Sequence, residues 1–475
     1  MATVREIPTY DAALAYLYGR INYERAAIPA YRVSNFKLER MRDLMRRLGD
    51  PHVGLPIVHV AGTKGKGSTS SMLASVLQAA GYRTGLYTSP HLERTEERLV
   101  VNGQCCDQDE FVRVLNVVLS GAEAMDEEGL RCTGPGGPTY FEIMTAMALV
   151  YFARQQVDAV VLEVGLGGRL DSTNIVQPTV TVITSISFDH TRQLGNTLAA
   201  IAGEKGGIIK PGIPVVTGVA EAEPLEVIER LAGAAQAPLL RIGRDFEYVF
   251  TPRIDGVAQD KLPRGRMDYR GRIGSRPTRY TDLELGLLGD HQAGNAAVAL
   301  ATIERLVELG WKIDETAVRR GLASVRCAAR IEVVRSEPTV VIDTAHNVAS
   351  ITALVRVLEA SRGINARHLV FACSKDKDAE GMLKLLLPHF QRVVLTRFLN
   401  NPRSLSPDEL LEIAGRVTSA LGSAQVECST AADPEAAWRQ VADQAGRDDL
   451  ICITGSFFLA AELRTMLRSD AAVSR

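Results

Sequence analysis

A glycine-rich segment, HVAGTKGKGST at residues 59–69, carries the residue types that a phosphate-binding loop requires. Glycines let backbone N–H groups converge on phosphate oxygens, Lys66 supplies a positive charge, and the Ser68 hydroxyl can bind Mg²⁺. The segment follows an apolar run and opens a helical pattern, which favours a phosphate site over an ordinary glycine-rich turn. Its spacing is neither GxxxxGK[ST], because Gly67 separates Lys66 from Ser68, nor the GxGxxG of dinucleotide sites. We therefore predict a mononucleotide triphosphate as the ligand.

Three more polar side chains stand near the ends of apolar runs, where open α/β sheets build their sites. Glu163 ends the run VVLEV, and a buried carboxylate there needs a partner or a metal ion, although a solvated strand end is the alternative. His190 follows the run TVTVITSIS, and a lone histidine is more often structural. Ser89 precedes Pro90 and by itself is typical of a turn. The position of each residue allows a role in a site, and each keeps its structural alternative.

The elements that must position these residues show an α/β pattern. The first half of the chain alternates β-branched apolar runs with helical spacing of apolar residues, which predicts a parallel sheet flanked by helices. The predicted strands lie within residues 56–62, 84–89, 158–165 and 179–186. The predicted helices lie within residues 66–80, 141–155 and 197–208.

The second half of the chain begins with a change of texture. Residues 245–285 are rich in Gly, Pro and Arg, which predicts a small β-rich appendage or a mobile loop, and a helix is predicted from His291 to about Leu309. Further apolar runs lie at residues 339–343, 368–373, 392–396 and 449–454. We predict a P-loop-containing parallel-sheet ATPase domain at residues 1–326 and a smaller Rossmann-like α/β domain at residues 327–475.

The composition is that of an ordinary folded protein, with 475 residues, 46% hydrophobic and 23% charged residues, and a net charge of −2. This charge gives no general field for nucleic acid or an anionic membrane, so neither is expected as a partner. The seven cysteines lack CxxC or zinc-type spacing and are interpreted as reduced thiols. Neither an apolar stretch of about 18 residues nor a secretion signal is found. These features predict a cytoplasmic location.

The loop variant G-T-x-G-K-G-[ST] resembles that of the Mur ligase superfamily, and further blocks extend the resemblance to its folylpolyglutamate synthase/dihydrofolate synthase family. The blocks follow the family's order and cover most of the chain: YTSPHLERTEERLVVNG (87–103), TYFE (139–142), LEVGLGGRLDSTN (162–174), SFDHTRQLGNT (187–197), IAGEKGGIIKPGIPVV (201–216), HQAGNA (291–296), DTAHN (343–347) and KDKD (375–378). The resemblance implies an ATP-dependent ligase that adds L-glutamate to a folate-type carboxylate through an acyl phosphate. Whether the acceptor is dihydropteroate, a tetrahydrofolate or both stays open.

The resemblance also implies roles at matching positions of this sequence. Nucleotide contacts are implied for Gly62, Thr63, Gly65, Lys66, Gly67, Ser68, Thr69, Asn295, Arg330, Asp343 and His346. Two Mg²⁺ ions are implied, with ligands from Ser68, Ser89, Glu163, His190 and a carbamylated Lys205. Contacts to the folate-type substrate are implied for Tyr140, Phe141, Leu170, Asp171 and Ser172. The implied catalytic residues are Lys66, Glu163, His190 and Lys205.

Several of these residues have ordinary structural explanations when the resemblance is set aside. Phe141 is then a core aromatic, Asp171 a turn-stabilising side chain, and Lys205 an exposed lysine on a helix. The chain also departs from the family pattern at three places. Lys64 stands where the loop usually has Asn, CAAR (327–330) where WPGR is usual, and Thr344 in the second position of DGAHN.

Two other functions stay open from the sequence. One is a Mur-type ligase that joins another amino acid to another acceptor, and the other is a nucleotide-binding relative that has lost ligase chemistry. The blocks TYFE and GLGGRLDSTN favour the folate branch, and the retained Lys66 and Glu163 favour catalysis. We expect small-molecule substrates, namely ATP, L-glutamate and a folate or dihydropteroate, and a monomeric protein.

Overall fold

The computed structural model describes residues 6–24, 38–131, 137–252, 261–262, 264–272, 277–422 and 426–473. Packing divides the described residues between two compact units. The first takes those within Met1–Val249, Asp268–Leu283 and Gly294–Val325, and the second those within Phe250–Met267, Glu284–Ala293 and Arg326–Arg475. The domain boundary near residue 326 stays a prediction.

The first unit is built on a sheet of eight strands, in the described part of the chain, with the order β4-β3-β2-β5-β1-β6-β7-β8. The strands from β2 to β8 in this order run parallel, and β3 and β4 extend one edge in antiparallel pairs. The strands are β1 (Ile57–Ala61), β2 (Thr84–Tyr87), β3 (Val100–Val101), β4 (Gln104–Cys105), β5 (Ala159–Glu163), β6 (Val180–Ile183), β7 (Val215–Thr217) and β8 (Leu239–Arg241). The predicted α/β fold with a parallel sheet is confirmed.

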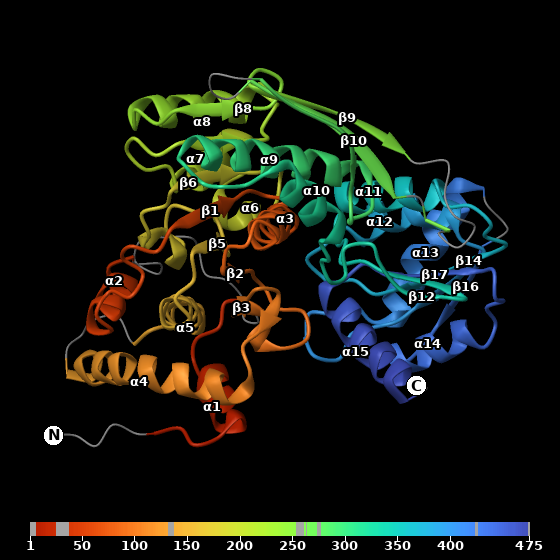
Figure 1. Cartoon of the computed structure of the whole chain (residues 1–475). Helices are drawn as coiled ribbons and strands as arrows, with labels where there is room; N and C mark the ends of the chain where they lie inside the picture. The colour runs from red at the N-terminus through yellow and green to blue at the C-terminus, as the bar shows by residue number, and fades with distance from the viewer. Residues whose placement is uncertain are drawn as a thin grey trace. The chain divides into compact units, whose positions relative to one another are not determined.

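Helices flank this sheet, and Figure 1 shows α4 beside α5 and α7 beside α8. The helices and helical turns are α1 (Tyr10–Tyr18), α2 (Leu38–Arg47), α3 (Lys66–Ala79), η1 (Thr95–Arg98), α4 (Gln108–Arg131), α5 (Tyr140–Arg154), η2 (Ser172–Ile175), α6 (Thr191–Leu194), α7 (Leu198–Gly206), α8 (Ala222–Ala234) and α10 (Glu315–Ser324). Helix α9 (Asp290–Glu308) ends two residues before Gly310. The three helices predicted in the first half correspond to α3, α5 and α7.

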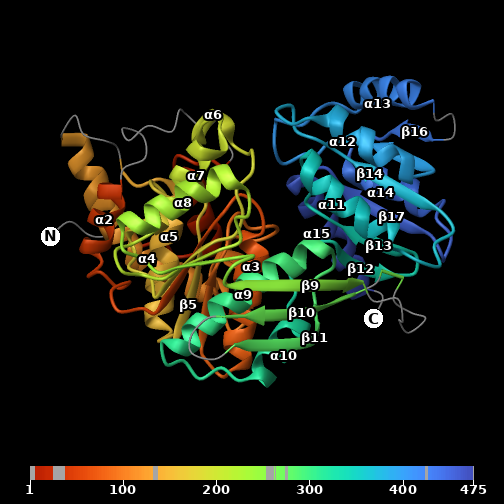
Figure 2. The ribbon, with the colours of Figure 1, turned by 90° about the horizontal axis from the view of Figure 1, so that it is seen from above.

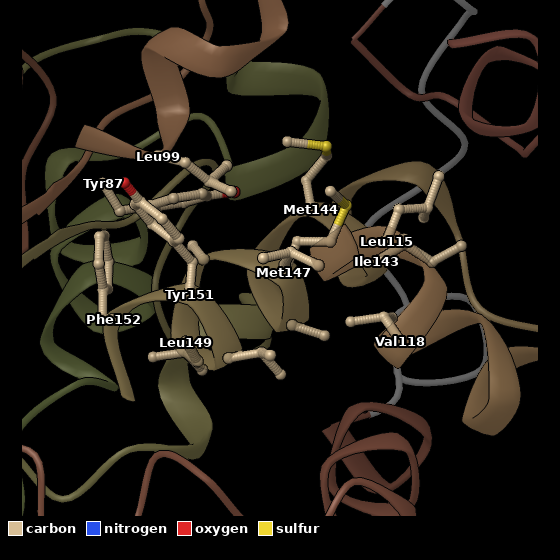
Figure 3. Packing of buried hydrophobic residues seen from close by; sticks show 14 of the residues in the cluster. Tyr87, Leu99, Leu115, Val118, Ile143, Met144, Met147, Leu149, Tyr151 and Phe152 are labelled. Atoms are coloured by element: carbon tan, nitrogen blue, oxygen red, sulfur yellow. The ribbon is translucent and has the colours of Figure 1, made fainter. Parts of the chain in front are cut away.

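Helix α5 is apolar on nearly all sides, which is the pattern of a buried helix. Every residue from Glu142 to Phe152 is buried, and its side chains pack with Leu115 and Val118 of α4 and with Tyr87 of β2 (Figure 3). This packing fixes the first turn of α5, which carries two of the substrate candidates.

Strands β9 (Phe246–Pro252), β10 (Gly265–Gly271) and β11 (Thr278–Glu284) form a separate sheet in the order β11-β10-β9, drawn in green in Figure 2. Glu304 of α9 lies against this sheet. Its side chain is buried, and its Oε2 accepts a hydrogen bond from the hydroxyl of Tyr269 at 3.1 Å. A Cβ on Gly271 would lie 2.1 Å from the same oxygen. A carboxylate is therefore enclosed between α9 and β10.

Glu304 makes stability depend on pH in a direction that can be measured. Burial raises the pKa of Glu304 from 4.5 to about 7. Between these values the native state binds more protons at this site than the unfolded state, so the free energy of unfolding falls as pH rises and stays lowered above pH 7. We expect Glu304→Gln to raise the free energy of unfolding by about 2 kcal/mol at pH 8, with little change near pH 4.5.

Thermal unfolding of the two proteins across this pH range measures the effect. Glu226→Gln is the matched control, because Glu226 is an exposed acid on α8 of the same unit and should leave the pH dependence unchanged. A Glu304→Gln protein that is less stable than the wild type at pH 8 would contradict the assignment.

The second unit contains a sheet in the order β12-β13-β17-β14-β15-β16, parallel except for the β12-β13 pair. Its strands are β12 (Glu332–Ser336), β13 (Thr339–Ile342), β14 (Arg367–Phe371), β15 (Arg392–Leu395), β16 (Glu427–Thr430) and β17 (Leu450–Thr454). Its helical segments are α11 (Val348–Glu359), α12 (Ala379–Leu386), η3 (Leu387–His389), α13 (Pro407–Leu421), α14 (Pro434–Ala442) and α15 (Phe457–Val473). Across the described residues of the chain, helices long and apolar enough to cross a membrane are absent.

Candidate active site

The predicted phosphate loop connects β1 to α3, and its backbone turns at two glycines. Gly62 and Gly65 have φ angles of 150° and 81°, a region that other residues rarely adopt. A Cβ on Gly62 would lie 1.9 Å from Oγ1 of Thr184, and one on Gly65 would lie 2.1 Å from Oδ1 of Asn295. The loop therefore requires glycine at both positions, and the side chain of Asn295 lies directly against it.

The N-terminus of helix α3 is suited to bind an anion. It begins at Lys66 with Gly65 as N-cap, so its first backbone N–H groups receive no side-chain cap. Such a helix start attracts negative charge. Nζ of Lys66 lies 3.5 Å from the carbonyl oxygen of Thr63, so its ammonium group folds back over the loop, while Ser68 and Thr69 are buried in the first turn. This arrangement can hold a phosphate group.

Glu163, the last residue of β5, lies beside the phosphate loop. Its carboxylate is buried, and Oε2 accepts a hydrogen bond from the N–H of Ser89 at 3.2 Å. A Cβ on Gly67 would lie 3.6 Å from this oxygen, so the loop backbone passes next to the carboxylate. Oγ of Ser89 is buried and makes no hydrogen bond to a described residue. A carboxylate and an uncommitted hydroxyl are ligands that Mg²⁺ prefers, so these residues fit such an ion.

The site offers few protein ligands. Within the described ranges, clusters of three or more His, Cys, Asp or Glu side chains suited to a metal ion are not found. A Mg²⁺ ion at Glu163 would therefore take its other ligands from hydroxyls, phosphate oxygens and water, as Mg²⁺ commonly does.

Lys205 of α7 also reaches the phosphate loop. The side chain is buried, and its Nζ donates to the carbonyl oxygen of Gly62 at 2.9 Å, which excludes the alternative of an exposed helix lysine. Burial, and after it the positive charge of Lys66, lower the pKa of Lys205 to about 7. A substantial neutral fraction near pH 7 follows, and the neutral amine is the form that reacts with CO₂.

His190 lies in the loop between β6 and α6. Its backbone is left-handed, with φ of 49°, and its side chain is 46% exposed. Its N–H donates to Oδ1 of Asp189 at 3.0 Å, and its Nε2 lies 3.9 Å from that oxygen. Asp189 in turn forms an ion pair with Lys64 at 2.8 Å. The His190 loop is thus joined to the phosphate loop by a pair that the sequence did not reveal.

The substrate candidates in TYFE lie at the start of α5, where Thr139 and Glu142 form a capping box. Tyr140 is fully buried, and its hydroxyl makes no hydrogen bond to a described residue. Phe141 is half-buried against the turn that follows β5, because a Cβ on Gly165 would lie 2.5 Å from Cζ of Phe141. Phe141 therefore packs as a core aromatic on one side and borders the turn on the other.

Asp171 is committed to the turn that carries the other substrate candidates. Its Oδ2 accepts from the N–H of Leu166 at 2.9 Å, and its Oδ1 accepts from the N–H and the hydroxyl of Thr173 at 3.0 and 2.5 Å. Burial raises the pKa of Asp171, and these hydrogen bonds oppose that shift. The contacts support the turn-stabilising explanation for Asp171, while its neighbours Leu170 and Ser172 are half-buried.

Arg330, Asp343 and His346 lie together in the second unit, around the turn after β13. Asp343 is buried and accepts from two backbone N–H groups at 2.8 and 2.9 Å. Burial raises the pKa of Asp343, and the charge of Arg330 opposes this shift. Arg330 donates to the hydroxyl of Thr344, and Nδ1 of His346 lies 2.9 Å from the carbonyl oxygen of Thr344. Thr344, a departure from the family pattern, therefore contacts the predicted phosphate-binding arginine.

Comparisons with known proteins agree with this geometry. The Mur ligase middle domain matches residues 60–303, and the Mur ligase glutamate ligase domain matches residues 329–457. The dihydrofolate synthase/folylpolyglutamate synthase of Bacillus subtilis (strain 168) is 36% identical over 465 residues, which cover 97% of this chain and 99% of the relative. The chain belongs to the folylpolyglutamate synthase/dihydrofolate synthase family of Mur ligases.

Solved structures of this family share the fold. The Mycobacterium tuberculosis folylpolyglutamate synthase complexed with ADP has a TM-score of 0.82 at 33% identity, and the match covers 96% of this chain and 98% of that one. The Escherichia coli FolC in complex with DHPP and ADP has a TM-score of 0.80 at 30% identity, and the match covers 99% and 100% of the two chains. The predicted membership of an ATP-dependent ligase family is confirmed.

Sequence reasoning missed a buried histidine that supports the family's GLGG turn. Nε2 of His59, in β1, lies 2.9 Å from Oγ1 of Thr173, whose hydroxyl donates to Asp171. The single hydroxyl proton is thereby used, so Nε2 of His59 must be the donor to Thr173. Burial lowers the pKa of His59 to about 3, which keeps it neutral. The hydrogen-bond network His59–Thr173–Asp171 therefore links the turn to β1.

Removing the middle of this network is expected to distort the turn. Thr173→Val should lower the free energy of unfolding by about 1–3 kcal/mol, because His59 loses its acceptor and Asp171 loses one donor. The KM for the folate-type substrate should rise more than the KM for ATP. Thr181→Val is the matched control, because Oγ1 of Thr181 is equally buried yet makes no hydrogen bond to a described residue. Equal losses of stability in Thr173→Val and Thr181→Val would argue against a role for the hydrogen-bond network.

Proposed function

We propose that this member of the folylpolyglutamate synthase family joins the amino group of L-glutamate to a carboxylate of a folate-type acceptor at the expense of ATP. The observation that carries the proposal is the convergence on one phosphate loop of three groups, namely Lys66, the Glu163–Ser89 pair and Lys205. A nucleotide-binding module alone does not require a buried carboxylate and a buried amine beside the phosphates.

The reaction proceeds in two displacements. An oxygen of the substrate carboxylate attacks the γ-phosphorus of ATP, and ADP leaves with the electron pair of the broken bond. The glutamate nitrogen then attacks the acyl carbon, gives up a proton, and phosphate leaves to complete the amide. The ammonium group of Lys66 and the first N–H groups of α3 stabilise the negative charge that develops on the transferred phosphoryl group.

The metal ligands are part of the proposal. Ser68, Ser89 and Glu163 would hold one Mg²⁺ ion, and His190 with Lys205 would hold a second. When bound, Mg²⁺ supplies the neutralisation of phosphate charge that phosphoryl transfer needs. The neutral Lys205 amine would attack CO₂ and release a proton, and the resulting carbamate presents oxygens where a cation stood before.

The acceptor side rests on the turn after β5 and the start of α5. Phe141 offers a half-exposed ring face for a flat bicyclic substrate, and Leu170 and Ser172 flank it in the family's substrate blocks. Tyr140 is fully buried, so its contribution would pass through its packing or through its hydroxyl, which makes no hydrogen bond within the described part of the chain. Asp171 would act by shaping the turn. Structures of the Escherichia coli relative in complex with DHPP and ADP, and with ADP without folate substrate, support a folate-type acceptor.

The remaining nucleotide contacts are proposed on the family pattern. Asn295 lies against the phosphate loop, and the second unit carries Arg330, Asp343 and His346 around one turn. We propose that all four contact ATP, and that residues 327–475 form the glutamate ligase domain.

ADP release tests the proposed activity directly. Purified protein with ATP, Mg²⁺ and a pteroate-type acceptor should form ADP over repeated turnovers only when L-glutamate is added, because glutamate consumes the acyl phosphate. Repeated turnover that does not depend on glutamate, or none with either dihydropteroate or tetrahydrofolate, would overturn the proposal. Dependence on a different amino acid would point to another Mur-type ligation.

A further inference from the structure

Two loops of the first unit are tied together by several hydrogen bonds. The N–H of Thr63 donates to the carbonyl oxygen of Ser185 at 2.7 Å, and the N–H of Lys64 donates to Oγ of Ser185 at 3.1 Å. The hydroxyl of Thr184 donates to the carbonyl oxygen of Lys64 at 2.7 Å, and Oγ1 of Thr63 accepts from the N–H of Ser187 at 3.1 Å. Hydrogen bonds therefore hold the phosphate loop against residues 184–187 of the loop after β6.

Beyond Ser187, an ion pair between Lys64 and Asp189 connects the two loops. Nζ of Lys64 donates to Oδ2 of Asp189 at 2.8 Å, and Oδ1 of the same carboxylate accepts from the N–H of His190 at 3.0 Å. The side chains of Lys64 and Asp189 are 34% and 14% exposed, so the pair is partly shielded from water. One carboxylate thus contacts both the lysine of the phosphate loop and the backbone of His190.

We propose that Lys64 is a positioning residue that, through Asp189, holds His190 at the phosphate loop. The carbonyl oxygen of His190 already accepts from the N–H groups of Gln193 and Leu194 at 2.9 Å, whereas its side chain is 46% exposed. The pair therefore adds a restraint on the side of His190 that faces the phosphate loop. A partly buried ion pair of this kind contributes a modest restraint on the position of the loop. The inference rests on the proposed function only in assigning a metal-binding role to His190.

The proposal separates Lys64 from Lys66. Lys66 lies over the loop carbonyl of Thr63, in place to meet a phosphate group, whereas the ammonium group of Lys64 is already paired with a carboxylate. A lysine acting directly on phosphate would be strengthened by removal of its carboxylate partner. A lysine acting through Asp189 would lose its effect when either partner is removed.

Hydrogen exchange of the ligand-free protein, read in a peptide that spans residues 184–194, tests the tie without any activity measurement. We expect Lys64→Asn and Asp189→Asn each to raise exchange in this peptide roughly two- to fivefold, with the double variant no faster than either single one. Lys64→Arg should restore slow exchange, because it keeps the charge. Lys312→Asn is the control, because it removes an exposed lysine of the same unit.

Turnover provides the second readout. In Lys64→Asn the Mg²⁺ concentration for half-maximal ADP formation should rise roughly tenfold, while the KM for the folate-type acceptor stays unchanged. Unchanged exchange in both single variants, or tighter ADP binding in Asp189→Asn together with weaker binding in Lys64→Asn, would overturn the proposal. A wild-type protein without glutamate-dependent turnover would overturn the proposed function. The exchange experiment would still test whether Lys64 and Asp189 restrain the His190 loop.

Discussion

Glu163→Gln is expected to lower kcat by on the order of 100-fold or more while leaving the protein folded. The carboxylate is buried beside the phosphate loop, next to the backbone at Gly67 and the N–H of Ser89. Glutamine keeps an oxygen that can accept from Ser89 but removes the negative charge that a Mg²⁺ ion needs. The steady-state rate of ADP formation measures the loss, and circular dichroism checks the fold.

Glu304→Gln is the matched control for this experiment, because it makes the same substitution at another buried glutamate of the same unit. It should leave kcat unchanged and raise stability at pH 8. Equal activity of Glu163→Gln and the wild type at saturating Mg²⁺ would remove Glu163 from the proposed metal site.

Lys205→Gln is expected to lower kcat by a similar factor, and the wild-type activity is expected to depend on CO₂. Lys205 is buried against Gly62, and glutamine at this position has no amine to react. Wild-type protein prepared in CO₂-free buffer should lose most of its activity and regain it when bicarbonate is added, whereas Lys205→Gln should not respond.

Mass spectrometry of the intact protein and of the peptide that contains Lys205 gives an independent measure. A mass increase of one CO₂ should appear in bicarbonate and disappear in its absence. Full activity in CO₂-free buffer would contradict carbamylation, even if Lys205→Gln is inactive.

The elements that carry the site were predictable because buried parallel strands read as continuous β-branched runs. The runs at 56–62 and 158–165 became β1 and β5, and Glu163 stands at the end of β5, as the run predicted. The two-residue strands β3 and β4 were missed, because so short a segment has no periodicity to detect. The family blocks supplied the remaining assignments.

Side-chain pairing was the part that the sequence could not show. Lys64 and Asp189 are 125 positions apart, and His59 and Thr173 are 114 apart, so each contact is created only when β1, β5 and β6 come together in the sheet. His59 was hidden because it sits within an otherwise apolar strand. The burial of Lys205 was equally invisible, since a helix lysine is usually exposed.

Mass spectrometry of the products gives the most direct test of the ligase activity, after incubation of the purified protein with ATP, Mg²⁺, L-glutamate and either dihydropteroate or a tetrahydrofolate. At least one acceptor should gain the mass of a glutamyl residue, with one ADP formed for each amide. ATP binding without any such adduct on either acceptor would contradict the proposed ligase activity.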